Sequence, residues 1–124
     1  MKKVLFALLA VTVLVASSCS KDAKINRRLD GEWKVTSYDG KALASDETET
    51  YTFAKTDKLK GTGTYAATGT GYSINIPFTY TIGDEKITLV VDGTDADVTT
   101  VTTYEKKKME FKDSDGVVTV LEPK

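Results

Sequence analysis

The chain has 124 residues, which suggests a single domain, and it carries a formal net charge of −1 with a pI near 5.5. This slightly acidic balance is not that of a protein that binds nucleic acid. One cysteine and no histidine are present, which excludes an internal disulfide and removes the commonest general base and metal ligand.

The first eighteen residues have the layout of an export signal. Lys2 and Lys3 precede an apolar run over residues 4–16 that only Thr12 interrupts. As a helix this run spans roughly 20 Å, whereas the hydrocarbon core of a bilayer is about 30 Å thick. We therefore expect a cleaved signal peptide over residues 1–18 rather than a permanent membrane span. Its removal takes two lysines away and brings the net charge to about −3.

The end of this segment resembles a known processing site. Residues 15–19, Val-Ala-Ser-Ser-Cys, are similar to the lipobox of bacterial lipoproteins, although Ala16 stands where leucine is commonest. The resemblance implies that signal peptidase II cleaves before Cys19 and that this cysteine carries a diacylglycerol thioether and a further acyl chain such as palmitate. Two or three acyl chains anchor a protein durably. Because Ser20 rather than aspartate follows, the resemblance favours the outer membrane without deciding which face.

Two features of this region remain open. The alternative to a lipobox is an ordinary secretory signal with Cys19 merely nearby. Under the lipobox interpretation, residues 19–28 are expected to be the lipidated cysteine and a short polar tether. Residues 23–29, just before Asp30-Gly31, are compatible with a single helical turn.

From residue 29 onward the pattern is that of an all-β domain, residues 29–124. Period-two alternation and turn signals recur about every ten residues, and short turns favour antiparallel neighbours. About eight up-and-down strands favour a closed barrel, because closure removes exposed edges; a two-sheet sandwich is the alternative. Pro77 lacks a ladder donor and predicts a bulge, bend or local edge. The strands are expected at residues 33–38, 50–54, 62–66, 73–82, 86–91, 98–104, 108–112 and 117–121.

Two stretches resemble a family of barrels. Residues 29–35 contain Gly31-Glu32-Trp33, which is similar to the G-x-W signature that opens the first lipocalin strand. Residues 80–89 resemble a hairpin of the small lipocalin-like domains of Bacteroidetes lipoproteins. The resemblance implies a barrel with Gly31 and Trp33 as fold signature. The chain departs from the family in its short domain and in having no arginine near its C-terminus to pack on the tryptophan.

Whether the barrel interior is filled or hollow decides between the candidate functions. Eight strands enclose a space that side chains fill or that holds one small ligand, and Trp33 is expected to close one end. If a pocket exists, we expect Tyr51, Phe53, Phe78 and Tyr80 to line it. The inward set is expected to be Trp33, Val35, Tyr51, Phe53, Ile74, Ile76, Phe78, Tyr80, Leu89, Val91, Met109 and Phe111.

Three further motifs have ordinary explanations. Residues 61–66 match G-x-G-x-x-A, but no helix is expected to follow to receive a pyrophosphate, so flexible hairpin glycines are favoured. Residues 92–97 hold three aspartates but lack the EF-hand spacing, which favours a solvated turn over a calcium site. Lys106-Lys107-Lys108 is expected to be a solvated turn, or else a contact to anionic head groups.

The sequence therefore predicts a binding protein rather than an enzyme, with no cofactor and no metal. No serine or threonine has a histidine to activate it, and no pair of acids is placed across a cleft. The favoured hypothesis is a membrane-anchored lipocalin-like lipoprotein of the cell envelope that binds a small apolar ligand. The alternative is a filled-barrel interaction module for an unidentified protein or glycan partner. A hydrolase or inhibitor is a distant third.

Overall fold

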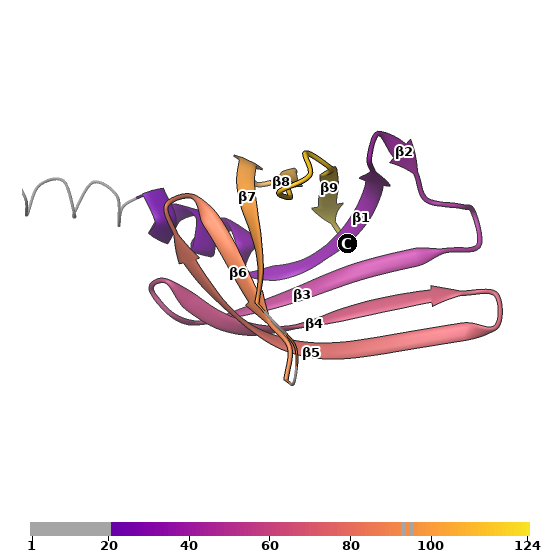
Figure 1. The fold of residues 1–124 in the computed structure, drawn as a ribbon, viewed down its shortest axis with the longest axis horizontal. Coiled ribbons are helices and arrows are strands. Elements are labelled where there is room, and N and C mark those ends of the chain that lie inside the picture. Colours follow the sequence, from indigo (N-terminus) through magenta and orange to yellow (C-terminus); the bar gives the residue numbers. More distant parts are fainter. Residues whose placement is uncertain (1–20, 93, 95) are drawn as a thin grey trace, which may run out of the picture.

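The computed structural model describes residues 21–92, 94 and 96–124. The predicted signal peptide, its cleavage site and Cys19 lie outside these residues. A helix over residues 21–29 leads into a run of strands (Figure 1). Within the described ranges no helix has the length and apolar character needed to cross a membrane.

The strands form one antiparallel sheet that closes on itself. The hydrogen-bonded order follows the chain from β1 through β3 to β9, and β1 also pairs with β9, which closes an eight-stranded barrel; β2 pairs with β1 alone. The all-β barrel prediction is confirmed. The strands described are β1 Gly31–Tyr38, β2 Lys41–Ala42, β3 Thr48–Asp57, β4 Lys60–Gly69, β5 Tyr72–Gly83, β6 Lys86–Val90, β7 Asp97–Tyr104, β8 Met109–Lys112 and β9 Val118–Pro123.

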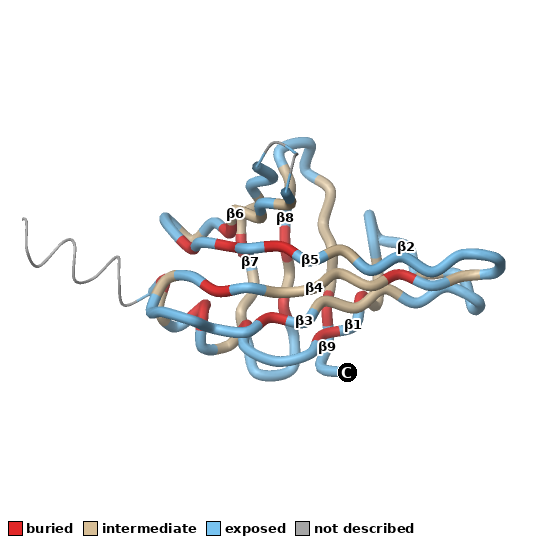
Figure 2. The backbone as a smooth tube through the Cα atoms, turned by 90° about the horizontal axis from the view of Figure 1, so that it is seen from below, coloured by how far each residue is buried: buried red, intermediate tan, exposed pale blue. Residues whose placement is uncertain are grey.

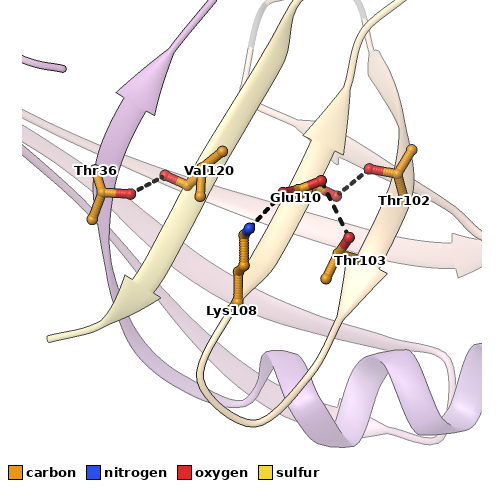
Figure 3. A network of polar contacts seen from close by, with 6 residues as sticks. All are labelled: Thr36, Thr102, Thr103, Lys108, Glu110 and Val120. Atoms are coloured by element: carbon orange, nitrogen blue, oxygen red, sulfur yellow. Dashed lines mark hydrogen bonds and ion pairs between the residues drawn. The ribbon is translucent and has the colours of Figure 1, made fainter. Parts of the chain in front are cut away.

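Two bulges help the short strands to close the barrel. The registers of β1 with β9 and of β7 with β8 shift at Thr36 and Thr102, and a bulge bends its strand. Each threonine hydroxyl donates to a carbonyl of the opposite strand, Thr36 to Val120 and Thr102 to Glu110, both at 3.3 Å (Figure 3). The bulged residues therefore keep a hydrogen bond to the partner strand.

The barrel is filled by large apolar side chains over much of its length. Leu121, Met109 and Ile87 are fully buried, and they come from strands far apart in the sequence. Most of the predicted inward residues belong to this core or pack against it. The buried cluster consists of Ile25, Leu29, Trp33, Val35, Phe53, Phe78, Tyr80, Ile82, Ile87, Val101, Met109, Phe111 and Leu121.

The prediction that Ile74 points into the core is wrong. Ile74 is 43% exposed because it lies where β3, β4 and β5 extend past the barrel. Figure 2 shows this extension on the right, mostly in the colours of exposed and intermediate residues. No strand of the barrel lies opposite the inward face of this extension.

The extension leaves β5 with one open edge. Residues 72–78 pair with β4, whereas pairing with β6 begins only at Thr79. The Ile82 N–H donates toward Leu59, on the β4 side, so in this regular register Pro77 lies with its nitrogen toward the open edge. The predicted local edge at Pro77 is confirmed, and the proline removes a donor there without breaking a hydrogen bond of the ladder.

The helix over residues 21–29 crosses the end of the barrel opposite the extension. Its Ile25 and Leu29 side chains are fully buried in the core. The buried Asn26 donates to the carbonyls of Asp57 and Lys58 in the β3–β4 turn, at 2.9 and 3.1 Å, and accepts from the Tyr80 hydroxyl at 2.6 Å. The expected polar tether with one helical turn is wrong for these residues, because the helix is longer and belongs to the core.

A second polar contact fastens the same helix. The Asp22 carboxylate accepts from the backbone N–H groups of Asp84 and Glu85 in the β5–β6 turn, at 3.2 and 3.0 Å. Both turn residues have positive φ, 53° and 59°, which points two N–H groups to one side. Burial of Asp22 is therefore compensated by hydrogen bonds.

The glycines of the G-x-G string do not serve loop flexibility as expected. Gly61 and Gly63 lie inside β4, where a Cβ atom would overlap the rings of Tyr80 and Phe78 respectively. The missing side chains allow two aromatic rings of β5 to lie flat on the neighbouring strand. These glycines are a packing feature of the core.

Candidate functional site

A small pocket opens at the end of the barrel away from the helix. Its volume is about 170 Å³, and it lies among β3, β4, β5, β6 and the loop that leads to β7. The register explains why aromatic side chains meet there: Tyr51 is paired with Tyr65, and Tyr65 with Ile76, so that all three share one face. The lining consists of Tyr51, Tyr65, Ile76, Phe78, Leu89, Val91, Thr94 and Asp97.

The four residues predicted to line a pocket lie at two depths. Tyr51 and Phe78 line it, with ring centroids 6.4 Å apart. Phe53 and Tyr80 lie below, 2% and 1% exposed, with their rings perpendicular at 5.5 Å. They form the floor on which the lining rings pack, and the pocket is therefore shallow.

Sequence reasoning did not find Tyr65, Thr94 and Asp97. Tyr65 packs against Tyr51 with ring centroids 5.0 Å apart. Tyr65 lies in β4, which was predicted as a strand, but only the register of β4 with β3 shows that its side chain is on the inward face. Thr94 and Asp97 come from a loop and a strand end, where alternation carries no information.

The charge at the pocket is negative. Asp97 is part of the lining, and the Tyr65 hydroxyl donates to the Glu49 carboxylate behind it. Burial raises the pKa of Tyr51 to about 12, with smaller contributions from Glu49 and Asp97. Burial and the hydrogen bond to Glu49 also raise the pKa of Tyr65. Both phenols therefore remain neutral hydroxyls at physiological pH.

A larger hollow of about 610 Å³ lies beside the barrel, where β1 leaves β3. The two strands pair only as far as Lys34 and Thr50, after which β1 pairs with β2. Its walls mix threonines, charged side chains and small apolar residues, and none of its lining side chains is aromatic. It therefore lacks the aromatic walls that the barrel mouth offers to a ligand.

Gly31 and Trp33, the predicted fold signature, lie at the end of the barrel opposite the aromatic pocket. Gly31 has φ of 129°, a conformation that favours glycine. Trp33 is 4% exposed, and its Nε1 donates to the Leu29 carbonyl at 2.8 Å, at the end of the helix. Trp33 thus joins the helix to the first strand and closes this end together with Ile25 and Leu29.

The aspartate and lysine motifs named from the sequence form no metal site among the described residues. The part of the chain that the structure describes holds no group of three Asp, Glu, Cys or His side chains arranged for a metal ion. Asp92 is exposed. Lys106, Lys107 and Lys108 form an exposed turn in which the Glu105 N–H donates to the Lys108 carbonyl, and Lys108 pairs with Glu110 at 3.1 Å (Figure 3).

The closed up-and-down barrel with a pocket at one end defines the class of the molecule, a small antiparallel β-barrel. Residues 29–111 match the family described as lipocalin-like domain, which covers more than half of the chain. The chain belongs to this lipocalin-like domain family. Such a fold is typical of binding proteins rather than enzymes.

Comparison with solved structures agrees on the fold. A crystal structure of AM182 in complex with serotonin superposes with a TM-score of 0.56 and 16% sequence identity, covering 83% of this chain and 69% of that chain. At this identity the likeness shows the fold alone. No curated protein matches the chain significantly.

Proposed function

We propose that this protein binds a small ligand at the mouth of its barrel while a lipid on Cys19 anchors it in the cell envelope. The observation that carries the binding proposal is the aromatic pocket of about 170 Å³. An apolar cavity of about 150 Å³ accepts benzene, whereas drug-sized ligands occupy about 300–1,000 Å³. The pocket therefore fits one ring or a short branched chain.

Membership of the lipocalin-like family supports this function. The structural neighbour AM182 was solved with serotonin, a small ring compound, so a barrel of this architecture accommodates such a ligand. A long acyl chain does not fit, because Phe53 and Tyr80 fill the barrel beneath the pocket. The ligand is thus smaller than a fatty acid.

The anchoring proposal draws on the sequence and on the position of the helix. Cys19 precedes the helix by two residues, and the helix crosses one end of the barrel. A lipid on Cys19 would hold that end at a membrane and leave the pocket facing away. Mass spectrometry of the native protein tests this directly: an N-terminal acylated Cys19 supports it, and an intact bond between Ser18 and an unmodified cysteine overturns it.

A filled-barrel interaction module is the second candidate. The packed lower half of the barrel favours it, and so do the exposed Tyr72 and Ile74 on the extension, at 46% and 43%. A ligand-binding experiment separates the two, because this function does not use the pocket.

The binding test uses the mature domain with Cys19→Ser and benzyl alcohol as an uncharged one-ring probe. We expect saturable NMR shifts of the ring signals of Tyr51, Tyr65 and Phe78. Leu89→Trp fills the pocket and should abolish them, whereas Val90→Trp, on the exposed face of the same strand, should not. A long-chain fatty-acid probe serves as the size control. No saturable shift with any one-ring probe would overturn the binding function.

A further inference from the structure

We propose that the pocket at the barrel mouth selects small organic ammonium ions over neutral and anionic molecules of the same size. The inference rests on the proposed binding function and adds the charge of the ligand. Three features of the described residues support it: a carboxylate in the lining, the aromatic walls, and the charge of the surrounding rim.

The first feature is a carboxylate that has no cationic partner. Asp97 lines the pocket, and Glu49 lies behind Tyr65, whose hydroxyl donates to it. In the described residues the ion pairs join Lys21 to Glu85, Lys108 to Glu110, and Lys124 to Glu32, so neither Asp97 nor Glu49 pairs with a lysine or arginine. A bound ammonium group would supply the missing positive charge.

The second feature is the wall. Tyr51, Tyr65 and Phe78 present aromatic rings to one small volume. Aromatic faces attract cations through the ring quadrupole, and the attraction grows when the cation leaves water. The apolar side chains of Leu89 and Val91 complete the wall. They shield the aromatic rings from part of the solvent, whereas Asp97 lies at the exposed mouth, where an ammonium group can reach it from solvent.

The third feature is the rim. The turns and strand ends around the mouth, residues 39–41, 49, 91–92, 96–97 and 112–117, contain six acidic residues and two lysines. A cleft ringed by one sign of charge focuses the field and concentrates the opposite ion. An anionic ligand would be repelled by the same field, and a neutral one would gain nothing from it.

The experiment compares three one-ring probes that differ in charge: benzylamine, benzyl alcohol and benzoate, each titrated into the Cys19→Ser mature domain. We expect benzylamine to bind about 5- to 30-fold more tightly than benzyl alcohol, the range between a solvent-exposed and a desolvated cation–π contact. Benzoate should bind most weakly. Added salt should reduce the preference for the amine.

Matched variants assign the preference to the pocket. Asp97→Asn should lower the affinity for benzylamine much more than that for benzyl alcohol and so remove most of the amine preference. Glu49→Gln should have the same effect more weakly. Asp115→Asn neutralises an exposed acid of the same rim that lies outside the lining, and should change little. Urea unfolding of each variant checks that it folds.

The outcomes separate the two proposals. Equal affinities for the three probes, or tighter binding of benzoate, would overturn the charge selectivity and leave the binding function standing. If Asp97→Asn and Glu49→Gln both keep the full preference for the amine, the proposed role of these carboxylates is overturned. No saturable binding of any probe would overturn both proposals together.

Discussion

Single atoms decide how the aromatic core packs. At Gly61 the absent Cβ makes room for the Tyr80 ring, and at Gly63 for the Phe78 ring. Because Phe78 lines the pocket and Tyr80 forms its floor, these two glycines set the depth of the pocket as well as the stability of the barrel.

Gly61→Ala is therefore expected to destabilise the fold by about 1–3 kcal/mol, the usual cost of overpacking a core. Gly83→Ala is the matched control, since its new Cβ would meet open space at the end of β5, and it should change stability by less than about 0.5 kcal/mol. Urea unfolding measures both. Equal stability of the two variants would contradict the packing explanation.

The buried tyrosines make stability depend on pH at the alkaline end. Burial raises the pKa values of Tyr51 and Tyr80 to about 12, above the ordinary 10. As the pH rises past 10, the unfolded chain loses these protons before the folded one, so the unfolded state is favoured. This stabilisation is complete below pH 10 and is lost as the pH rises toward 12.

We accordingly expect the free energy of unfolding to fall between pH 10 and about 12. In Tyr80→Phe the fall should be smaller, although this variant also loses the hydrogen bond to Asn26 and starts from a lower stability. Tyr38→Phe, at a residue 53% exposed, is the control and should keep the full fall. A free energy that stays constant across this range would refute the linkage.

At the scale of elements, the helix over residues 21–29 is a structural part of the barrel. It presents Asp22, Ile25, Asn26 and Leu29 to the core and its basic residues to solvent. Its contacts reach the β3–β4 and β5–β6 turns, and Lys24 lies over the Tyr104 ring at the end of β7, 6.0 Å from its centroid. It therefore ties together strands that are distant along the chain.

Ile25→Ala tests this role. Truncating a fully buried isoleucine should cost about 2–5 kcal/mol of stability. Arg27→Ala, on the exposed face of the same helix, should cost less than about 0.5 kcal/mol. If the segment were only a tether, thermal unfolding of the two variants would be indistinguishable.

The strands were predictable because their signal is local. Alternation places residues such as Phe53, Phe78 and Phe111 on one face without knowledge of the partners. The helix was predicted as no more than a single turn because its buried face is half polar: Asp22 and Asn26 interrupt the apolar stripe, and their burial is explained only by the turns to which they hydrogen-bond. Ile74 was misplaced because alternation does not reveal where a strand leaves the barrel.

The candidate site was predictable only in part for the same reason. Tyr51 and Phe78 follow from the inward pattern of their strands. Tyr65 needs the register of β4 with β3, and Asp97 needs the path of the loop before β7. Contacts across strands and loops fix these positions, and a single sequence does not state them.

At the scale of the molecule, the charge is divided between the two ends. The helix and the turns beside it, residues 21–30, 57–60, 83–86 and 105–108, contain ten lysines and arginines and six acids. The rim of the mouth has the opposite sign. A domain anchored through Cys19 would thus turn its basic end to an anionic membrane, and each Lys or Arg near such a surface contributes about 1 kcal/mol.

This division of charge predicts how the non-lipidated domain binds vesicles. It should bind phosphatidylcholine vesicles that contain phosphatidylglycerol, and hardly bind pure phosphatidylcholine. The double variant Lys106→Glu and Lys107→Glu should weaken this binding strongly, because the reversed charges lie in the turn next to the helix. The double variant Lys41→Glu and Lys112→Glu makes the same change in net charge at the mouth end and should have little effect. Vesicle sedimentation measures both, and equal losses would show that net charge, rather than an oriented basic end, governs the contact.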